Sequence, residues 1–273
     1  MSAVLAIAAA ELAIARRNLW VAIATALMVL FSAVLTFAGS GPTGTLGVDL
    51  LTVAVTSLTT LSVYIVPLIA LLLAFDAVAG EAERGTLALI LSYPVPRAAI
   101  LGGKFVAHLL VLAGALAAGY AVAGGMAWAL DRVSGESLAA LLRLFWTACL
   151  LGAAFLGLGY AVSARVRNPG AAAGLAIALW LVFVVLYDLG LLGALVADAG
   201  GTFTQTVFPW LLIGNPADAF RLANLPQGEV AALASGVAGA ARAVSGAMAL
   251  ASLAVWPAGA LLLAWAAFRR VTP

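Results

Sequence analysis

The sequence predicts an all-α polytopic membrane protein with six transmembrane helices. Of its 273 residues, 65% are hydrophobic and only 9% are charged, and the mean hydropathy is +1.17. Soluble domains carry roughly 25% charged residues, so a soluble fold could not hide this much apolar surface. At about 20 residues per span, the length permits six helices joined by short connections.

The chain opens with an apolar, alanine-rich segment, residues 1–18, which we expect to form a short interfacial helix under the membrane. A cleaved signal peptide is the alternative, but it needs positive charge ahead of its apolar stretch, and none precedes Ala3. If Arg16 is taken as the basic start, the apolar run 19–38 could also be mistaken for a signal peptide. We expect this run to remain as the first span, because the orientation of the later spans depends on it.

The predicted spans are the long apolar runs at residues 19–38, 58–78, 105–130, 140–162, 170–187 and 244–268. Pro67 and Pro257 fall inside two of them and predict a kink or a local opening of the backbone. Residues 39–57 are rich in Gly and Thr and should form an outer loop. Gly170 and Gly174 have a spacing that suits helix dimers but is common by chance, and packing against lipid or within the chain explains it equally well.

The charged segment Asp76–Lys104 lies between the second and third predicted spans. Its ions and interrupted backbone would go unsatisfied in hydrocarbon, so it must lie on one face of the membrane. Within it, residues Thr86–Tyr93 can form about two helical turns before Pro94 ends the helix. A short surface helix held by two spans can pass force from a soluble partner into those spans.

This segment resembles the cytoplasmic loop of ABC-2 type permeases. The matching residues are Gly80, Glu81, Glu83, Arg84, Gly85, Thr86 and Leu87, then Ser92, Pro94, Val95 and Arg97, then Gly103, Lys104 and Phe105. The resemblance implies a coupling site for a separate ATPase, in which Glu81 and Glu83 face basic residues of that partner. The implied site consists of Glu81, Glu83, Arg84, Gly85, Thr86, Leu87, Pro94 and Arg97. The alternative is an ordinary solvated loop.

The family resemblance also implies a homodimer that works with two copies of an ABC ATPase. We expect ATP and Mg to be bound by that ATPase, with no cofactor and no catalytic residue in this chain. A nucleotide-binding loop is absent: next to Gly103-Lys104, Ala98 stands where the motif needs its first Gly, and Phe105 where it needs Ser or Thr.

Residues 66–81 look most like the permease of the transporters that process copper for nitrous oxide reductase. This likeness implies delivery of copper, or of a sulfur species needed with it, and a periplasmic β-helical accessory protein as a partner. Soft metals prefer thiolate, thioether and imidazole ligands. The candidates are scattered over different predicted helices, so we expect no metal site and a subunit that transmits force. They are Cys149, His108, Met1, Met28, Met126 and Met248.

The distribution of basic residues predicts the orientation in the bacterial inner membrane. With a cytoplasmic amino terminus, nine of the 13 Lys and Arg residues face the cytoplasm and four face outward. Basic residues are retained inside during insertion, so both termini are expected in the cytoplasm. The segment 79–104 is then a cytoplasmic loop and 188–243 a periplasmic segment. The net charge of +2 is too small and too spread out to suggest nucleic acid.

The segment 188–243 is the longest break between spans and could bind the periplasmic partner. In it, Asn215 can cap a helix whose first residue is Pro216, and a further helix is expected at 229–241. Asp218 and Arg221 are three residues apart and can pair along the first helix. The candidate partner contacts are Phe208, Trp210, Asn215, Asp218 and Arg221.

Two ionisable groups lie near the inner ends of spans. Asp76 fits an interfacial cap or a partner for a nearby Arg better than a transport role, and His108 fits a hydrogen bond to a neighbouring helix better than a proton or metal role. An exporter of a lipid, polysaccharide or drug remains the alternative function. An intramembrane enzyme lacks its motifs, and an ion channel lacks rings of charge.

Overall fold

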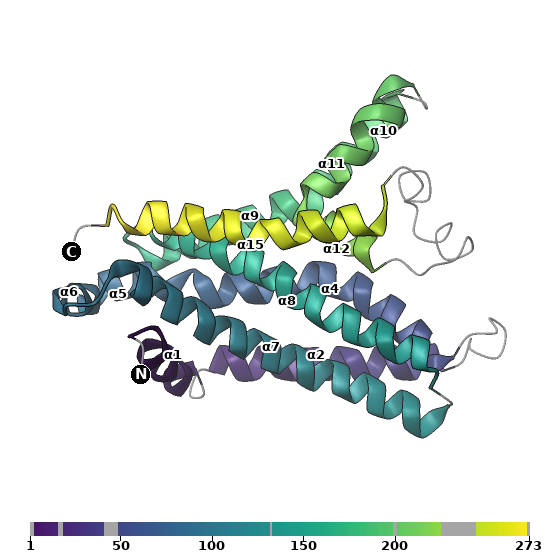
Figure 1. Ribbon diagram of the computed structural model, residues 1–273, viewed down its shortest axis with the longest axis horizontal. Helices are drawn as coiled ribbons and strands as arrows, with labels where there is room; N and C mark the ends of the chain where they lie inside the picture. The colour runs from purple at the N-terminus through teal and green to yellow at the C-terminus, as the bar shows by residue number, and fades with distance from the viewer. Residues whose placement is uncertain are drawn as a thin grey trace.

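The computed structural model describes residues 3–15, 19–40, 49–131, 133–198, 201–224 and 244–271. These residues form helices and no strand, and six helical stretches among them are long and apolar enough to cross a membrane. The predicted all-α polytopic fold is therefore confirmed. Figure 1 shows α1, α5, α6 and the last turn of α15 together at one end of the helix bundle, which we call the α5–α6 end.

The first two helices cover one side of α7. The helix α1 (Ala3–Ala15) lies within the predicted interfacial segment, and α2 (Leu19–Gly39) forms the first span. Both pack against α7 (Arg97–Leu130), and α2 also touches α4 (Leu50–Ala74). Only two residues of α1, Ala8 and Ala15, are buried, so most of this helix faces away from the protein.

The second span is longer than predicted. The helix α4 begins at Leu50 rather than at residue 58, because the side chain of Asp49 caps it by accepting a hydrogen bond from Thr52 N. Two threonines that suggested a loop have partners at the start of α4: the Thr52 hydroxyl donates to Asp49 Oδ1 at 2.6 Å, and the Thr56 hydroxyl donates to the carbonyl of Thr52 at 2.9 Å. Such bonds satisfy a polar side chain inside an apolar helix.

The segment after α4 is more helical than the predicted loop 79–104. The helix α5 (Asp76–Glu83) follows almost without a break, and α6 (Thr86–Ser92) is the expected short helix. Gly85 joins them with φ of 72°, a left-handed conformation that favours glycine. The helix α7 begins at Arg97, directly after Pro96, so residues 97–104 form its first two turns rather than a loop.

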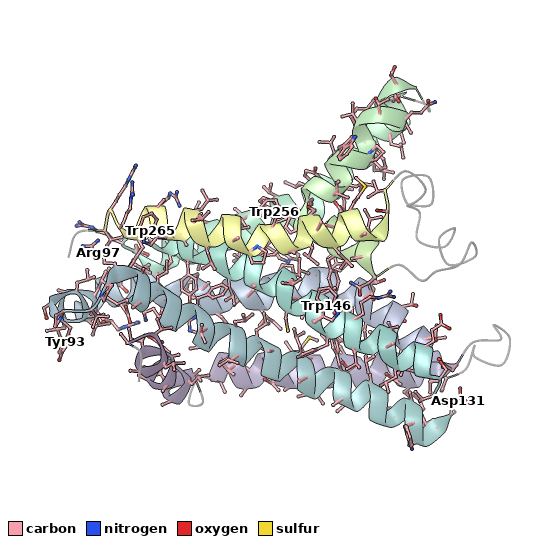
Figure 2. All side chains as sticks on the ribbon, in the orientation of Figure 1. Tyr93, Arg97, Asp131, Trp146, Trp256 and Trp265 are labelled. Carbon is pink, nitrogen blue, oxygen red and sulfur yellow. The ribbon has the colours of Figure 1, made fainter. Side chains whose placement is uncertain are left out.

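The core of the bundle is built around α8 (Gly135–Ser163), which packs against α4 on one side and α15 (Gly246–Phe268) on the other. Its side chains Phe155 and Tyr160 are fully buried. The opposite end of the bundle is tied by two acids. Asp131 accepts a hydrogen bond from Leu50 N, and Asp49 accepts one from Ser134 N. Figure 2 shows Asp131 there and Tyr93 and Arg97 at the α5–α6 end.

The fifth span continues past the predicted end at residue 187. A π-helical turn, η1 (Val182–Leu186), joins α9 (Pro169–Leu181) to α10 (Tyr187–Asp198), so the start of the predicted segment 188–243 is helical. The chain then returns through η2 (Phe203–Val207), α11 (Phe208–Gly214) and α12 (Pro216–Ala223). Figure 1 shows α10 and α11 leaving the bundle together. The helix expected at 229–241 lies outside the described residues.

Candidate functional site

The segment α5–α6, which contains the predicted coupling residues, is anchored to α8 by one hydroxyl. Ser163 Oγ accepts hydrogen bonds from the backbone N of Val78 and of Ala79, each at 3.0 Å, and donates to the carbonyl of Phe75 at 2.6 Å. The apolar residues of α5 are buried beside this contact. A force applied to α5 therefore reaches α8 directly.

The acids of this segment differ in their surroundings. Glu83 is exposed, whereas the side chain of Glu81 is only 13% exposed and pairs with Lys104 Nζ at 2.6 Å. Lys104 also pairs with Glu11 of α1. Asp76 pairs with Arg84 at 3.3 Å, as expected for a partner of a nearby Arg. The carboxylate of Glu81 is thus engaged inside the protein, and Glu83 is the acid that a partner could reach.

The remaining predicted coupling residues are divided between surface and interior. Arg84, Gly85, Thr86 and Pro94 are exposed, while Leu87 is 2% exposed and packs into the core. Arg97 Nη1 donates to three carbonyls at the end of α15, those of Phe268, Arg269 and Val271. Arg97 therefore holds the carboxyl-terminal end of α15 in place.

Two surface residues of this segment were missed by sequence reasoning. Leu89 is 66% exposed and Tyr93 is 67% exposed, although both are large and apolar. Leu89 lies on α6 and Tyr93 directly follows its last residue, and their spacing of four was the signal that could have identified them. Together with Glu83 and Arg84 they form an exposed surface at the α5–α6 end, which we call the coupling surface.

At the opposite end, the predicted partner contacts are mostly engaged within the chain. Asn215 caps α12 by accepting from Ala217 N, and its side-chain N donates to the carbonyl of Phe183 in η1 at 2.7 Å. Arg221 donates to Asp218 at 2.7 Å, the predicted pair, and also to Asp188 of α10 at 2.9 Å. These bonds fix α12 to the π-helical turn and to α10.

The aromatic members of that set lie on the projecting helices. Phe208 is half-buried and meets the ring of Phe203 edge-on, with 6.5 Å between ring centroids. Trp210 is 62% exposed. Of the five predicted contact residues, Trp210 is the one that is exposed.

The electrostatics of α12 centre on Asp218, whose side chain is 2% exposed. Burial and the nearby Asp188 raise the pKa of Asp218 to about 7, although Arg221 acts in the opposite direction. Burial outweighs the attraction because Arg221 serves two carboxylates, and Asp218 Oδ2 is buried without a hydrogen-bond partner.

Comparison with known proteins gives the family. The model of the ABC-2 family transporter proteins matches residues 5–272. The chain belongs to the ABC-2 transporter family. It is 42% identical to the probable ABC transporter permease protein NosY of Pseudomonas aeruginosa and 41% identical to the protein of that name from Stutzerimonas stutzeri, over 99% of each chain in both cases. It is therefore a permease subunit of an ABC transporter and a multi-pass membrane protein.

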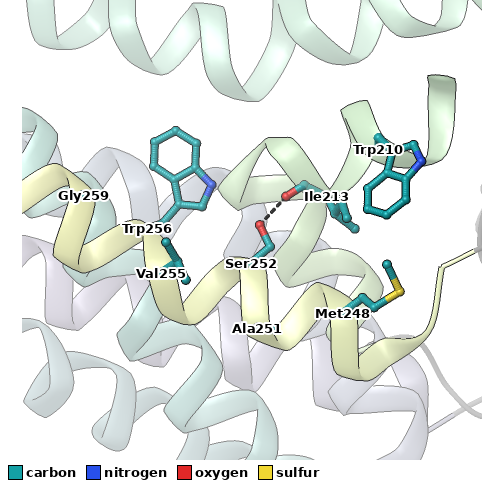
Figure 3. Close-up of a pocket in the computed structure, with 8 residues that line it drawn as sticks. All are labelled: Trp210, Ile213, Met248, Ala251, Ser252, Val255, Trp256 and Gly259. Atoms are coloured by element: carbon teal, nitrogen blue, oxygen red, sulfur yellow. Dashed lines mark hydrogen bonds between the residues drawn. The ribbon is translucent and has the colours of Figure 1, made fainter.

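An apolar groove runs along the outer face of the permease between α11 and α15. Its volume is about 510 Å³, and Figure 3 shows Trp210 and Trp256 near its two ends. Ser252 donates a hydrogen bond to the carbonyl of Ile213 and so ties α15 to α11 at the floor of the groove. The lining residues are Trp210, Ile213, Met248, Ala251, Ser252, Val255, Trp256 and Gly259.

The interior of the permease offers little for metal binding. Among the residues that the structure describes, no three His, Cys, Asp or Glu side chains gather into a group that could hold a metal ion. His108 Nδ1 and Tyr160 Oη are 2.6 Å apart, a hydrogen bond between α7 and α8, as predicted for this histidine. Cys149 is half-buried and free.

Proposed function

We propose that the permease couples ATP hydrolysis by a separate ABC ATPase to the delivery of copper, or of a sulfur species needed with it, for the maturation of nitrous oxide reductase. The observation that carries this proposal is the identity of 41–42% to NosY permeases, which extends over 99% of each chain. Identity at that level along the whole length supports a shared process as well as a shared fold.

The proposed assembly is a homodimer in the bacterial inner membrane with two copies of the ATPase. The α5–α6 end faces the cytoplasm in this proposal, because the exposed Arg84, Arg167 and Arg270 lie there and basic residues are retained inside. Both termini are then cytoplasmic. The ATPase, which binds ATP and Mg, docks on the coupling surface.

The permease acts in this proposal by moving helices. Force on α5–α6 passes through Ser163 into α8, and α8 packs against α12 and α15. The helix α12 is in turn bonded to η1 and α10, so the projecting helices follow. A periplasmic β-helical accessory protein of the NosD type receives this movement at Trp210. The scarcity of metal ligands in the described interior favours movement over conduction of copper.

The test is the copper content and activity of nitrous oxide reductase in cells that lack this gene. We expect an enzyme that is present but deficient in its catalytic copper centre, and restored when the gene is returned on a plasmid. A fully loaded and active enzyme in the deletion strain would contradict the proposed process and leave the family assignment intact.

An exporter of a lipid, polysaccharide or drug is the second candidate. The observation that favours it is the groove between α11 and α15, whose exposed Trp210 and Val255 give it an apolar wall. Substitution of Trp256 by Ser would then change which compounds stimulate ATP hydrolysis by the purified complex. Under the first proposal the same variant leaves the response to added compounds unchanged.

A further inference from the structure

We propose that Lys104 is the joint through which movement of α5 reaches α1, so that the amino-terminal helix is a moving part of the transporter. This inference rests on the proposed function, because it requires an ATPase that acts on the coupling surface. The inference adds to the proposed function by giving Lys104 and Glu11, whose side chains are largely buried, a role in positioning α1.

One ammonium group connects three helices. Lys104, in the second turn of α7, donates to Glu81 Oε1 of α5 at 2.6 Å and to Glu11 Oε1 of α1. The side chain of Lys104 is 5% exposed, and those of Glu11 and Glu81 are 16% and 13% exposed. A buried ion pair that loses one partner leaves an uncompensated charge, so the three groups are constrained to move together.

The apolar composition of α1 indicates a structural role for Glu11. Glu11 is the single ionisable residue among Ala3–Ala15, and every exposed residue of this helix is apolar, including Leu5 and Ile14. A helix that presents such a surface to lipid gains nothing from a carboxylate unless the carboxylate has a partner. Glu11 is therefore explained by its pairing with Lys104.

A close backbone contact lies next to the ionic one. A Cβ atom placed on Gly103 would lie 2.7 Å from Cβ of Ile7 and 2.9 Å from the carbonyl oxygen of Val4. Only glycine lets α1 rest on α7 at this distance. The steric and ionic contacts are adjacent in sequence, so α1 is fixed to the first turns of α7 at this point.

The joint tolerates rotation of α5. Glu81 Oε2 is buried and accepts no hydrogen bond in the structure, while Oε1 holds Lys104. When α5 turns, Lys104 can pass from one oxygen of Glu81 to the other without losing its charge partner. The pair with Glu11 meanwhile carries the displacement of Lys104 to α1.

The test uses Glu11→Gln in the assembled permease–ATPase complex, with Cys149 replaced by Ala. This variant leaves Lys104 paired with Glu81, so charge is balanced and the fold is retained. An environment-sensitive dye is attached either at Ala13→Cys on α1 or at Ala88→Cys on α6, both of which are exposed positions outside the coupling surface. The emission of the dye is compared with and without trapped ATP.

In the unsubstituted complex we expect ATP to shift the emission at both positions. In Glu11→Gln we expect the shift at position 88 to remain and the shift at position 13 to be lost, with ATP hydrolysis continuing while reductase maturation falls. Glu136→Gln, which changes an exposed acid at the opposite end, should keep both shifts. Lys104→Arg should also keep both, because Arg preserves the charge.

Two results would overturn the joint. One is a shift at position 88 without a shift at position 13 in the unsubstituted complex, and the other is a normal shift at position 13 in Glu11→Gln. Either would leave the proposed function standing. No shift at position 88 in the unsubstituted complex would contradict the proposed function and the joint with it.

Discussion

The side-chain amide of Asn215 donates to the carbonyl oxygen of Phe183 at 2.7 Å. Phe183 precedes the projecting helices α10 and α11 in the chain, and Asn215 follows them. Phe183 lies in the π-helical turn η1, where the regular helical bonds are interrupted. Asn215 is 1% exposed, so water does not replace this bond. One side chain thus caps α12 and also satisfies the backbone of the fifth span.

Asn215→Ala should destabilise the protein more than a cap substitution alone. Loss of the cap costs about 1 kcal/mol, and loss of the hydrogen bond to Phe183 costs a further ~0.5–1.5 kcal/mol. The matched control is Asn168→Ala, because Asn168 also caps a helix that begins at Pro but is exposed. Thermal unfolding in detergent measures both, and equal losses for the two variants would show that the bond to Phe183 contributes nothing.

Asp218 should make stability fall as the pH rises. Its pKa is raised from 3.8 to about 7 in the folded protein, mainly by burial, so the folded chain binds its proton more tightly than the unfolded chain does. The contribution is complete below the unfolded pKa and is lost as the pH rises through the folded one. The unfolding temperature measured from about pH 5 to about pH 8 should decline less in Asp218→Asn than in the unsubstituted protein.

The control for this experiment is Glu136→Gln, which neutralises an exposed acid. It should follow the pH profile of the unsubstituted protein. A profile of Asp218→Asn that runs parallel to the original would mean that another group is responsible for the pH dependence.

Arg97→Ala should loosen the end of α15. The guanidinium of Arg97 binds three carbonyls from Phe268 to Val271, and a helix end that loses such partners frays. Hydrogen exchange should become faster at the backbone amides of residues 269–271, with the rest of α15 unchanged. Arg167→Ala, at an exposed position of the same end, should leave these rates as they are.

Leu89→Ser should weaken ATPase binding and Leu87→Ser should lower stability, although both residues lie on α6. Leu89 is 66% exposed and Leu87 is 2% exposed. Leu89→Ser should keep the unfolding temperature but reduce co-purification of the ATPase, since an apolar contact at an interface centre is worth about 1–2 kcal/mol. Leu87→Ser should lower stability by about 2–5 kcal/mol, as other large-to-small core changes do. Full co-purification with Leu89→Ser would remove this residue from the coupling surface.

Glu83→Lys tests the same surface by charge. Reversal of Glu81 and Glu83 together would confound two effects, because Glu81 pairs with Lys104 inside the protein. Glu83→Lys alone should weaken ATPase binding if basic residues of the partner face it. The matched change is Glu136→Lys at the opposite end of the bundle, which should bind the ATPase normally. Identical binding by both variants would rule out a charge contact at Glu83.

Much of the fold followed from hydrophobicity, because apolar runs of span length have few alternatives to membrane helices. The ends of the helices were less predictable. Residues 50–57 contain three hydroxyl side chains that suggested a loop, yet a cap at Asp49 and bonds back to the helix make them helical. Residues 188–198 suggested an outer segment because of Asp188, whose charge is met by Arg221, far along the chain.

The candidate site was predictable as a segment but not residue by residue. The motif and the proline spacing located α6, whereas most of α5 lies in residues that were expected to form a span end or a loop. The partners of Glu81 and Arg97 lie in α7, α1 and the end of α15, and such long-range pairings leave no pattern in one sequence.

The wide turn η1 has a geometric consequence for α10. A π-helical turn contains one residue more than an α-helical turn, and each residue advances an α-helix by about 100° about its axis. If the extra residue moved along the helix by one turn, the side chains it passed would swing by that angle while α9 kept its packing. The π-helical turn is thus a point at which the fifth span can rotate about its own axis. The hydrogen bond from Asn215 to Phe183 holds this turn, and with it the direction of α10, in the observed position.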